Sequence, residues 1–273
     1  MRIAVLITCY NRVQTTLECL RRVYEQVLPS DCSLDVWLVD DASPDGTADQ
    51  VQSAYPQTHV IRTNGGLFWC KGMRLAWDTA AESFDYDFYL WLNDDSMLEP
   101  MAISWSLADY EKVRSVIVGT IATDETETAV DFSAVKKDGS RPFPNGVDPV
   151  ACDGRLNGNF VLVPREVFKK IGPIYGGYRH GAGDGDYAMM LLKNKLPFYS
   201  SSHFCGWCQE TRKRFYEVRG VSLRERWRLL MDPKGYNLHD TFVFRYRHWG
   251  LGRAIVSSCH VIYKALTTKT GLR

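Results

Sequence analysis

The amino-acid sequence predicts an α/β fold in which a mostly parallel sheet is flanked by helices and followed by a C-terminal helical extension. Apolar runs of strand length alternate with segments of helical spacing through the first half of the chain. Two aspartate pairs, Asp40-Asp41 and Asp94-Asp95, directly follow such runs. Alternating strands and helices form right-handed crossovers, and ligands bind beyond the carboxyl ends of the strands. Both pairs are therefore expected at the ligand-binding edge.

Each strand of this half is a continuous apolar run, such as IAVLIT or LDVWLV, which suits a sheet covered on both faces. Turn signals such as SPDGT and NGG separate the runs, and Pro100 suits the first turn of a further helix. In chain order, the predicted elements are a strand at 3–8, a helix from Val13, a strand at 34–39, a helix at 47–54, a strand at 59–62, a helix at 70–82 and a strand at 88–92.

The second half is less regular. SVIVGT predicts a strand, and the polar, turn-rich residues 122–157 suggest an inserted hairpin or mobile loop. GNFVLVP predicts a strand and REVFKKIG a short helix, and a glycine-rich loop then runs into a helix near Gly183. The last part has a helical pattern with breaks at Pro233 and Gly250. We therefore expect one domain at 1–220, made of halves at 1–120 and 121–220, and a helical extension at 221–273.

Composition narrows the class of protein. With 273 residues, of which 45% are hydrophobic, the chain can bury a substantial core. Its 33 Lys and Arg balance 32 Asp and Glu, which is not the basic footprint of a nucleic-acid-binding protein. The first apolar run is too short for a signal peptide, and no stretch reaches the roughly 18 uncharged apolar residues of a spanning helix. We expect a cytoplasmic protein, at most peripheral at the inner face of a membrane.

The eight cysteines are scattered, and without an export signal they argue against a disulfide framework. The CGWC at 205–208 has the spacing of a redox pair or of half a zinc site. The sequence has no second CxxC, and the surrounding residues lack the opening of a thioredoxin-like unit. Reduced, partly buried thiols are the expectation.

The paired carboxylates predict a metal and a phosphorylated ligand. Adjacent carboxylates at a strand end are costly unless a cation or hydrogen-bond donors stabilise them. Mg²⁺ and Mn²⁺ prefer oxygen ligands and keep waters and substrate phosphates in their shell. For Asp94-Asp95 alone, a solvated turn with a helix N-cap is the alternative. Asp40-Asp41 at the same edge favours the ligand site, and no GxGxxG or Walker sequence offers a glycine cradle for phosphates.

In this order and spacing, VLITCYNR, VDDASPDGT, NGG and LNDDS resemble the N-terminal half of glycosyltransferase family 2 enzymes, which have the GT-A fold. GNFVLVPREVFKKIG followed by GDGDYAMMLLK resembles their acceptor-side half. The resemblance covers about residues 1–205 and is greatest to bacterial rhamnosyl-like and polysaccharide-assembly members. It implies transfer of a sugar from a UDP- or dTDP-sugar to a hydroxyl of a glycan or lipid-linked glycan, with Mn²⁺ or Mg²⁺ as cofactor.

The resemblance also implies where the donor binds. Thr8 and Tyr10 would line the nucleotide pocket, and Asp41 would bind the base. Asn64 and Gly65 would flank the nucleotide sugar.

Asp94 and Asp95 correspond to the family's DxD-like site. Asp95 is the favoured metal ligand, and Asp94 its neighbour at the ribose or the metal. The family's usual first aspartate is replaced by Asn93, which leaves the number of metal ligands open.

The family's catalytic base belongs to a Glu-Asp pair that opens a helix, and this chain has Gly183-Asp184 there. Asp184 is therefore the candidate base and Asp186 the second candidate, with a helix N-cap as the alternative role for Asp184. A carboxylate there would take the proton of the acceptor hydroxyl as its oxygen attacks the anomeric carbon. One base and no nucleophile imply inversion of configuration.

Further residues are weaker candidates. His203 follows the base helix, where related enzymes often carry a histidine near the diphosphate or metal, and an ordinary hydrogen-bonded histidine is the alternative. Trp69, Tyr178 and Trp207 could stack on sugar rings, with core packing as the alternative for each. His180 is placed near the acceptor or diphosphate by adjacency to Asp184 alone.

The segment FVFRYRHWGLGRAIVSSCHVIYKALTTK mixes apolar and aromatic residues with Arg and Lys. Such a pattern could rest on an anionic membrane, which would suit a lipid-linked acceptor. The alternative is an amphipathic helix that packs on the domain or on a second copy in a homodimer.

Two other functions stay open. A sugar-nucleotide nucleotidyltransferase also uses a parallel sheet and metal-binding carboxylates, but TCYNRVQTT is not its glycine-rich basic loop. A catalytically dead subunit that binds a nucleotide sugar or a glycan is compatible with Gly183.

Overall fold

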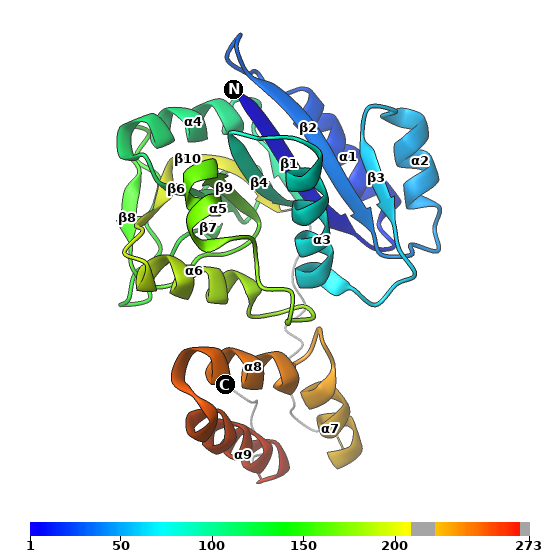
Figure 1. Cartoon of the computed structure of the whole chain (residues 1–273), viewed down its shortest axis with the longest axis vertical. Helices are drawn as coiled ribbons and strands as arrows, with labels where there is room; N and C mark the ends of the chain where they lie inside the picture. Colours follow the sequence, from blue (N-terminus) through cyan, green and yellow to red (C-terminus); the bar gives the residue numbers. More distant parts are fainter. Residues whose placement is uncertain (209–221, 268–273) are drawn as a thin grey trace.

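A computed structural model describes residues 1–208 and 222–267 (Figure 1). A central sheet flanked by helices confirms the predicted α/β class. The strands are β1 (Arg2–Cys9), β2 (Ser33–Asp40), β3 (His59–Arg62), β4 (Phe88–Asn93), β5 (Ser96–Leu98), β6 (Val116–Ala122), β7 (Val130–Phe132), β8 (Val150–Cys152), β9 (Phe160–Pro164) and β10 (Phe198–Cys208). The helices are α1 (Val13–Tyr24), α2 (Thr47–Ala54), α3 (Phe68–Ser83), α4 (Ala102–Val113), α5 (Arg165–Ile171), α6 (Gly183–Lys193), α7 (Leu223–Met231), α8 (Leu238–Trp249) and α9 (Leu251–Thr267).

One continuous sheet runs through both predicted halves of the domain, in the order β3-β2-β1-β4-β9-β6-β10-β5. The strands β3, β2, β1 and β4 are parallel, and β9 is antiparallel to both of its neighbours, β4 and β6. The parallel register pairs Cys9 with Asp40 and Thr8 with Asn93. The ends of β1, β2 and β4 therefore meet at one edge, as the sequence predicts.

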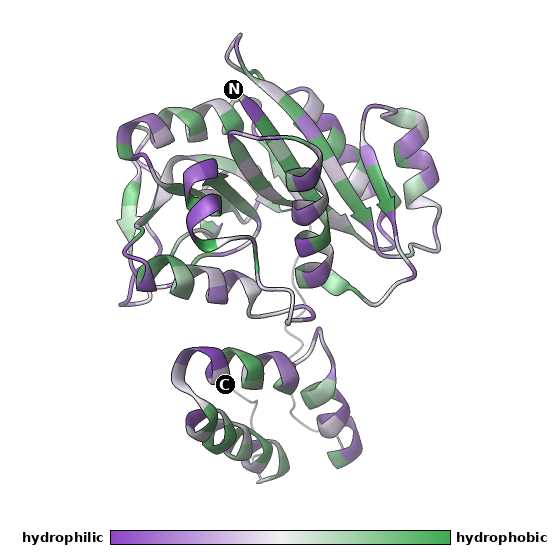
Figure 2. Cartoon of the chain, viewed as in Figure 1, coloured by the Kyte–Doolittle hydropathy of each residue, from purple (hydrophilic) through white to green (hydrophobic). Residues whose placement is uncertain are grey.

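The sheet is covered on both faces. Alternate residues of β1 belong to different apolar clusters. Ile3 and Val5 pack with residues of α1, α2 and α4 on one face. Ala4 and Leu6 pack with residues of α3, α5 and α6 on the other. The strands are largely hydrophobic, whereas the helices alternate between hydrophobic and hydrophilic segments (Figure 2). This burial on both faces explains why the strands read as continuous apolar runs.

The region 122–157 contains short strands that extend the sheet. β7 pairs with β6 and β8 with β10, and an isolated bridge joins Val135 to Arg155. Two strands, β5 and β10, were not predicted from the sequence. The CGWC at 205–208 ends β10, and both of its thiols are reduced and buried. Burial raises the pKa of Cys205 to about 11, which does not suit a redox nucleophile.

The extension forms three helices, with the predicted breaks at Pro233 and Gly250. Leu230, Val261 and Ala265 form a small apolar cluster within the extension. The predicted domain boundary near 220 lies outside the described residues. Among the helices of residues 1–208 and 222–267, none has the length and apolarity needed to cross a membrane.

Close contact between α3 and the end of β1 yields a stability prediction. A Cβ on Gly72 would lie 2.4 Å from Thr8 Oγ1, which is too close for any real contact. Gly72→Ala should therefore lower the free energy of unfolding by about 1–3 kcal/mol, measured by urea denaturation. The matched control is Gly252→Ala in α9, where a Cβ meets nothing within 4 Å. Equal effects of the two substitutions would contradict the close approach.

Candidate functional site

A cavity of about 510 Å³ opens at the carboxyl ends of β1, β2 and β4. This volume lies in the range of ligand pockets for small molecules and cofactors. The cavity brings together eight residues predicted from the sequence: Thr8, Tyr10, Asp41, Asn64, Gly65, Trp69, Asp94 and His180.

Asp41 is buried and fixes the loop that leads into α3. Its Oδ1 accepts a hydrogen bond from Leu67 N at 3.0 Å, and its Oδ2 accepts one from Phe68 N at 2.9 Å. Gly65 and Gly66 adopt left-handed backbone angles with φ of 87° and 84°, which lets the loop turn around this carboxylate. Each carboxylate oxygen can accept more than one hydrogen bond, so Asp41 can hold the loop and still meet a ligand donor.

Asp94 and Asp95 form the turn between β4 and β5, and the Arg12 guanidinium contacts both. Arg12 Nη1 lies 2.8 Å from Asp95 Oδ2 and 3.3 Å from Asp94 Oδ1. Asp94 Oδ2 accepts a hydrogen bond from Thr16 Oγ1 at 3.3 Å. Burial, followed by the charge of Asp94, raises the pKa of the Cys9 thiol nearby. The end of β1 therefore faces concentrated negative charge that Arg12 compensates.

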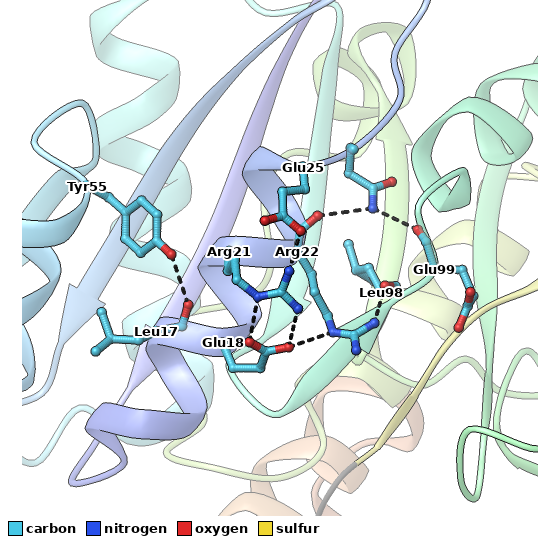
Figure 3. A network of polar contacts seen from close by, with 9 residues as sticks. Leu17, Glu18, Arg21, Arg22, Glu25, Tyr55, Leu98 and Glu99 are labelled. Atoms are coloured by element: carbon cyan, nitrogen blue, oxygen red, sulfur yellow. Dashed lines mark hydrogen bonds and ion pairs between the residues drawn. The ribbon is translucent and has the colours of Figure 1, made fainter.

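Helix α1 also holds the strand that follows this turn (Figure 3). Arg22 Nη1 donates to the carbonyl oxygen of Leu98 at 3.1 Å. Glu18 accepts hydrogen bonds from Arg21 and Arg22, and these outweigh burial and lower the pKa of Glu18 to about 2. Because β5 ends at Leu98, one helix positions both the aspartate turn and the strand after it.

The aspartate turn fits a divalent cation that also binds a diphosphate. Asp95 Oδ1 is buried and lacks a hydrogen-bond partner within the described residues. Such an oxygen is costly unless a ligand or ion satisfies it. The described part of the chain contains no group of three or more His, Cys, Asp or Glu side chains able to hold a metal. Mg²⁺ needs no such group when one or two carboxylates, waters and substrate phosphates complete its shell.

Asn93 connects the aspartate turn to Trp69. Trp69 Nε1 donates to Asn93 Oδ1 at 2.7 Å, and Asn93 Nδ2 donates to Asn159 Oδ1 at 2.8 Å. An indole N–H can only donate, so this contact fixes the orientation of the Asn93 amide. A Cβ on Gly158 would lie 2.5 Å from the Trp69 ring, so the ring is also held by packing. Asn93 and Gly158 therefore help to position Trp69 in the cavity.

Asp184 lies in the first turn of α6, and it is not among the residues that line the cavity. Ala182 is the N-cap residue of α6, so Asp184 is not the cap. Burial, followed by the charge of Asp184, raises the pKa of the Cys70 thiol in α3. A Cβ on Gly183 would lie 2.6 Å from Cys70 Sγ and 2.9 Å from Ile174 Cδ1. A longer side chain at position 183 would therefore require Cys70 and Ile174 to shift.

Asp186 anchors α6 to the extension and does not line the cavity. It is 2% exposed and accepts hydrogen bonds from Tyr178 Oη at 2.8 Å, Arg247 Nε at 3.0 Å and His248 Nε2 at 2.8 Å. Burial lowers the pKa of His248 although Asp186 opposes the shift, which favours a neutral ring. Lys193 Nζ lies 2.8 Å from His248 Nδ1, so a neutral ring accepts there and donates to Asp186. These contacts offer no support for a base at Asp186 or for a sugar contact at Tyr178.

His203 and Trp207 also lie away from the lining of the cavity. The His203 ring stacks on Trp105 with the centroids 4.5 Å apart, and its Nδ1 lies 2.9 Å from Ser202 Oγ. Trp207 lies under the guanidinium of Arg22, 5.5 Å from the ring centroid. These positions offer no support for a metal ligand at His203 or a sugar contact at Trp207.

Two charged residues that line the cavity, Arg12 and Lys234, were not predicted from the sequence. Arg12 belongs to the CYNR stretch, where a basic residue directly after the first strand, at the predicted ligand-binding edge, could have been noticed. Lys234 comes from the extension, and no local pattern indicates that it reaches the cavity. His180 lines the cavity, as its place in the glycine-rich loop suggested, and meets Phe68 edge-on with the ring centroids 6.3 Å apart.

A family model described as "Glycosyl transferase family 2" matches residues 4–171. The mannosyltransferase PcManGT from Pyrobaculum calidifontis, in complex with GDP-Man and Mn²⁺, is similar over 98% of this chain and 76% of its own, with a TM-score of 0.55 and 16% identity. S. aureus TarS 1–349 in complex with UDP-GlcNAc is similar over 98% of this chain and 76% of its own, with a TM-score of 0.57 and 14% identity. No curated protein sequence matches the chain significantly. The structural likeness confirms the expected GT-A fold.

The contacts of Asn93 predict the effect of restoring the aspartate. Asn93→Asp should lower the free energy of unfolding by about 1–3 kcal/mol, because it removes the donor to Asn159 and adds a carboxylate beside Asp94. The control is Asn157→Asp, since Asn157 Oδ1 only accepts a hydrogen bond, from Asn159 N. Urea denaturation of both variants tests this. A fully stable Asn93→Asp variant that binds Mn²⁺ more tightly would contradict the positioning role.

Proposed function

Because the chain belongs to glycosyltransferase family 2, we propose that its cavity binds a nucleoside-diphosphate sugar and that the protein transfers this sugar to an acceptor hydroxyl. The observation that carries the proposal is the cavity where three strands end, which is lined by Asp41 after β2 and by Asp94 after β4. Two structurally similar enzymes were solved with GDP-Man and UDP-GlcNAc, which supports a nucleotide sugar as the donor class. A UDP- or dTDP-sugar is the donor that we propose.

The residues that line the cavity have proposed roles in binding the nucleotide sugar. Thr8 and Tyr10 line the nucleotide pocket, and Asp41 accepts a hydrogen bond from the base. Asn64 and Gly65 flank the sugar nucleotide. The loop fixed by Asp41 makes this part of the cavity largely preformed, which lowers the cost of ordering it on binding.

Asp95, with Asp94 beside it, would hold Mn²⁺ or Mg²⁺. The orphaned Asp95 Oδ1 supports this assignment, and PcManGT was solved with Mn²⁺. When bound, the ion would neutralise charge that develops on the departing diphosphate. Arg12 keeps the two carboxylates together at the turn by contacting both.

Asp184 is the proposed base. Its carboxylate takes the proton of the acceptor hydroxyl, whose oxygen forms the new bond to the anomeric carbon. The bond from that carbon to the diphosphate oxygen breaks, and the electron pair leaves with the diphosphate. Attack opposite the leaving group inverts the anomeric configuration. Asp186 holds the start of α6, and so Asp184, through Tyr178, Arg247 and His248.

A glycan or lipid-linked glycan is the proposed acceptor, in surface polysaccharide synthesis, and the extension is the proposed membrane contact. Ten of the seventeen exposed large hydrophobic side chains in the described residues lie on α7, α8 and α9. Residues 222–267 carry eight Lys and Arg against three Asp and Glu, whereas residues 1–208 carry 19 against 27. Exposed apolar and basic side chains together suit an anionic membrane surface.

Donor turnover tests the reaction. With Mn²⁺ or Mg²⁺, the protein should release nucleoside diphosphate from a UDP- or dTDP-sugar. Asp184→Asn should lower kcat by about 10²–10⁴-fold and leave donor affinity intact, and Asp95→Asn should weaken metal-dependent donor binding. The control is Asp148→Asn, an exposed carboxylate in a distant loop. Nucleotide binding without turnover across a panel of acceptors would instead indicate a catalytically dead subunit.

Vesicle sedimentation tests the membrane contact. The protein should sediment with vesicles that contain anionic phosphatidylglycerol and stay in solution with neutral phosphatidylcholine. Val256→Asp, at a site 70% exposed on α9, should weaken this binding. The control is Val147→Asp, at a site 62% exposed in the sheet domain. A stable dimer that Val256→Asp dissociates, without vesicle binding, would show that a second copy covers this surface.

A further inference from the structure

Lys234 brings a positive charge from the extension into the cavity. It lines the cavity with Tyr10 and Asp94, and its Nζ lies 5.7 Å from the centroid of the Tyr10 ring. Every lining residue except Lys234 comes from the sheet domain. The cavity is therefore completed by a side chain from the C-terminal helices.

The turn that carries Lys234 is held by hydrogen bonds. Lys234 N donates to Asp232 Oδ1 at 2.8 Å, and Gly235 N donates to the Asp232 carbonyl oxygen at 3.0 Å. Tyr236 N donates to the carbonyl oxygen of Leu229 at 2.9 Å. The backbone at Lys234 is fixed, while its long side chain keeps the freedom to meet a ligand.

Asp240 ties this turn to the cavity wall. Asp240 is 1% exposed and accepts hydrogen bonds from Arg179 N at 2.9 Å and His180 N at 3.0 Å. It also accepts one from Asn237 Nδ2, and Asn237 donates through the same amide to the carbonyl oxygen of Pro233 at 3.2 Å. One buried carboxylate thus links the turn of Lys234 to the loop of His180, and both residues line the cavity.

Among the charged residues that line the cavity, Lys234 is the cation placed to bind an anionic ligand. Arg12 is already paired with Asp94 and Asp95. Lys234 forms no ion pair with the carboxylates of residues 1–208 and 222–267. A lysine held at the mouth of a cavity without a carboxylate partner favours an anionic ligand, and charge-assisted contacts with phosphate oxygens are among the stronger hydrogen bonds.

We propose that Lys234 binds the diphosphate of the donor, so that the C-terminal extension is part of the donor site. The proposal rests on the proposed function, because it takes the nucleoside-diphosphate sugar as the ligand. It adds a residue from outside the 4–171 segment that the family model matches. The extension then has two roles in one site, since α8 also holds Asp186 through Arg247 and His248.

Calorimetry with nucleotides of decreasing charge tests this assignment without any need for turnover. UDP, dTDP and GDP are first titrated in the presence of Mn²⁺ to find the diphosphate that binds. The monophosphate and the nucleoside with the same base are then titrated. Lys234→Ala should weaken diphosphate binding by about 10–100-fold, affect the monophosphate less and leave the nucleoside unchanged. Lys234→Arg should retain most of the affinity. Arg253→Ala, which removes a positive charge from α9 outside the cavity, should bind like the unmodified protein.

The outcomes separate this assignment from the proposed function. If the unmodified protein binds a diphosphate and Lys234→Ala binds it equally well, the role of Lys234 is wrong and the proposed function stands. If Lys234→Ala weakens the nucleoside as much as the diphosphate, Lys234 acts through Tyr10, and the phosphate contact is again wrong. If the unmodified protein binds none of the three diphosphates, both proposals fail.

Discussion

The parallel pairing of β1 with β2 and β4 is the constraint on which the rest of the site depends. These three strands run in the same direction, so they all end at one edge of the sheet, at Cys9, Asp40 and Asn93. The loops that follow them surround one cavity. Parallel strands must be buried on both faces, so the helices that cover them also fix these loops. Arg12 and Thr16 lie at the start of α1, which follows β1. They contact the Asp94-Asp95 turn at the end of the neighbouring strand, β4.

The aspartate pairs were found from sequence because strand ends follow from local patterns. Within the pairs, the roles diverge through contacts that the sequence does not show. Asp40 accepts hydrogen bonds from Ser43 N and Ala48 N and holds the loop before α2, whereas Asp41 lines the cavity. The strand β10 was not predicted because its three consecutive serines, which are buried, give the sequence a polar pattern. Long-range partners satisfy them, as when Ser202 donates to Asp109 from both its backbone and its hydroxyl.

The departures from the family pattern have local explanations in packing. Asn93 accepts a hydrogen bond from Trp69 and donates one to Asn159. Gly183 packs against Cys70 and Ile174, so a longer side chain there would have to displace them. Lys234 lay beyond sequence reasoning for another reason, since a turn between two C-terminal helices reaches the cavity only through tertiary contacts such as those of Asp240.

A crystal structure of the protein with Mn²⁺ and the nucleoside diphosphate that it binds tests the central claim most directly. The account predicts an anomalous manganese peak between the Asp94-Asp95 turn and the diphosphate, with the base beside Asp41. A nucleotide bound outside the cavity at the ends of β1, β2 and β4, or a manganese peak away from Asp95, would contradict it.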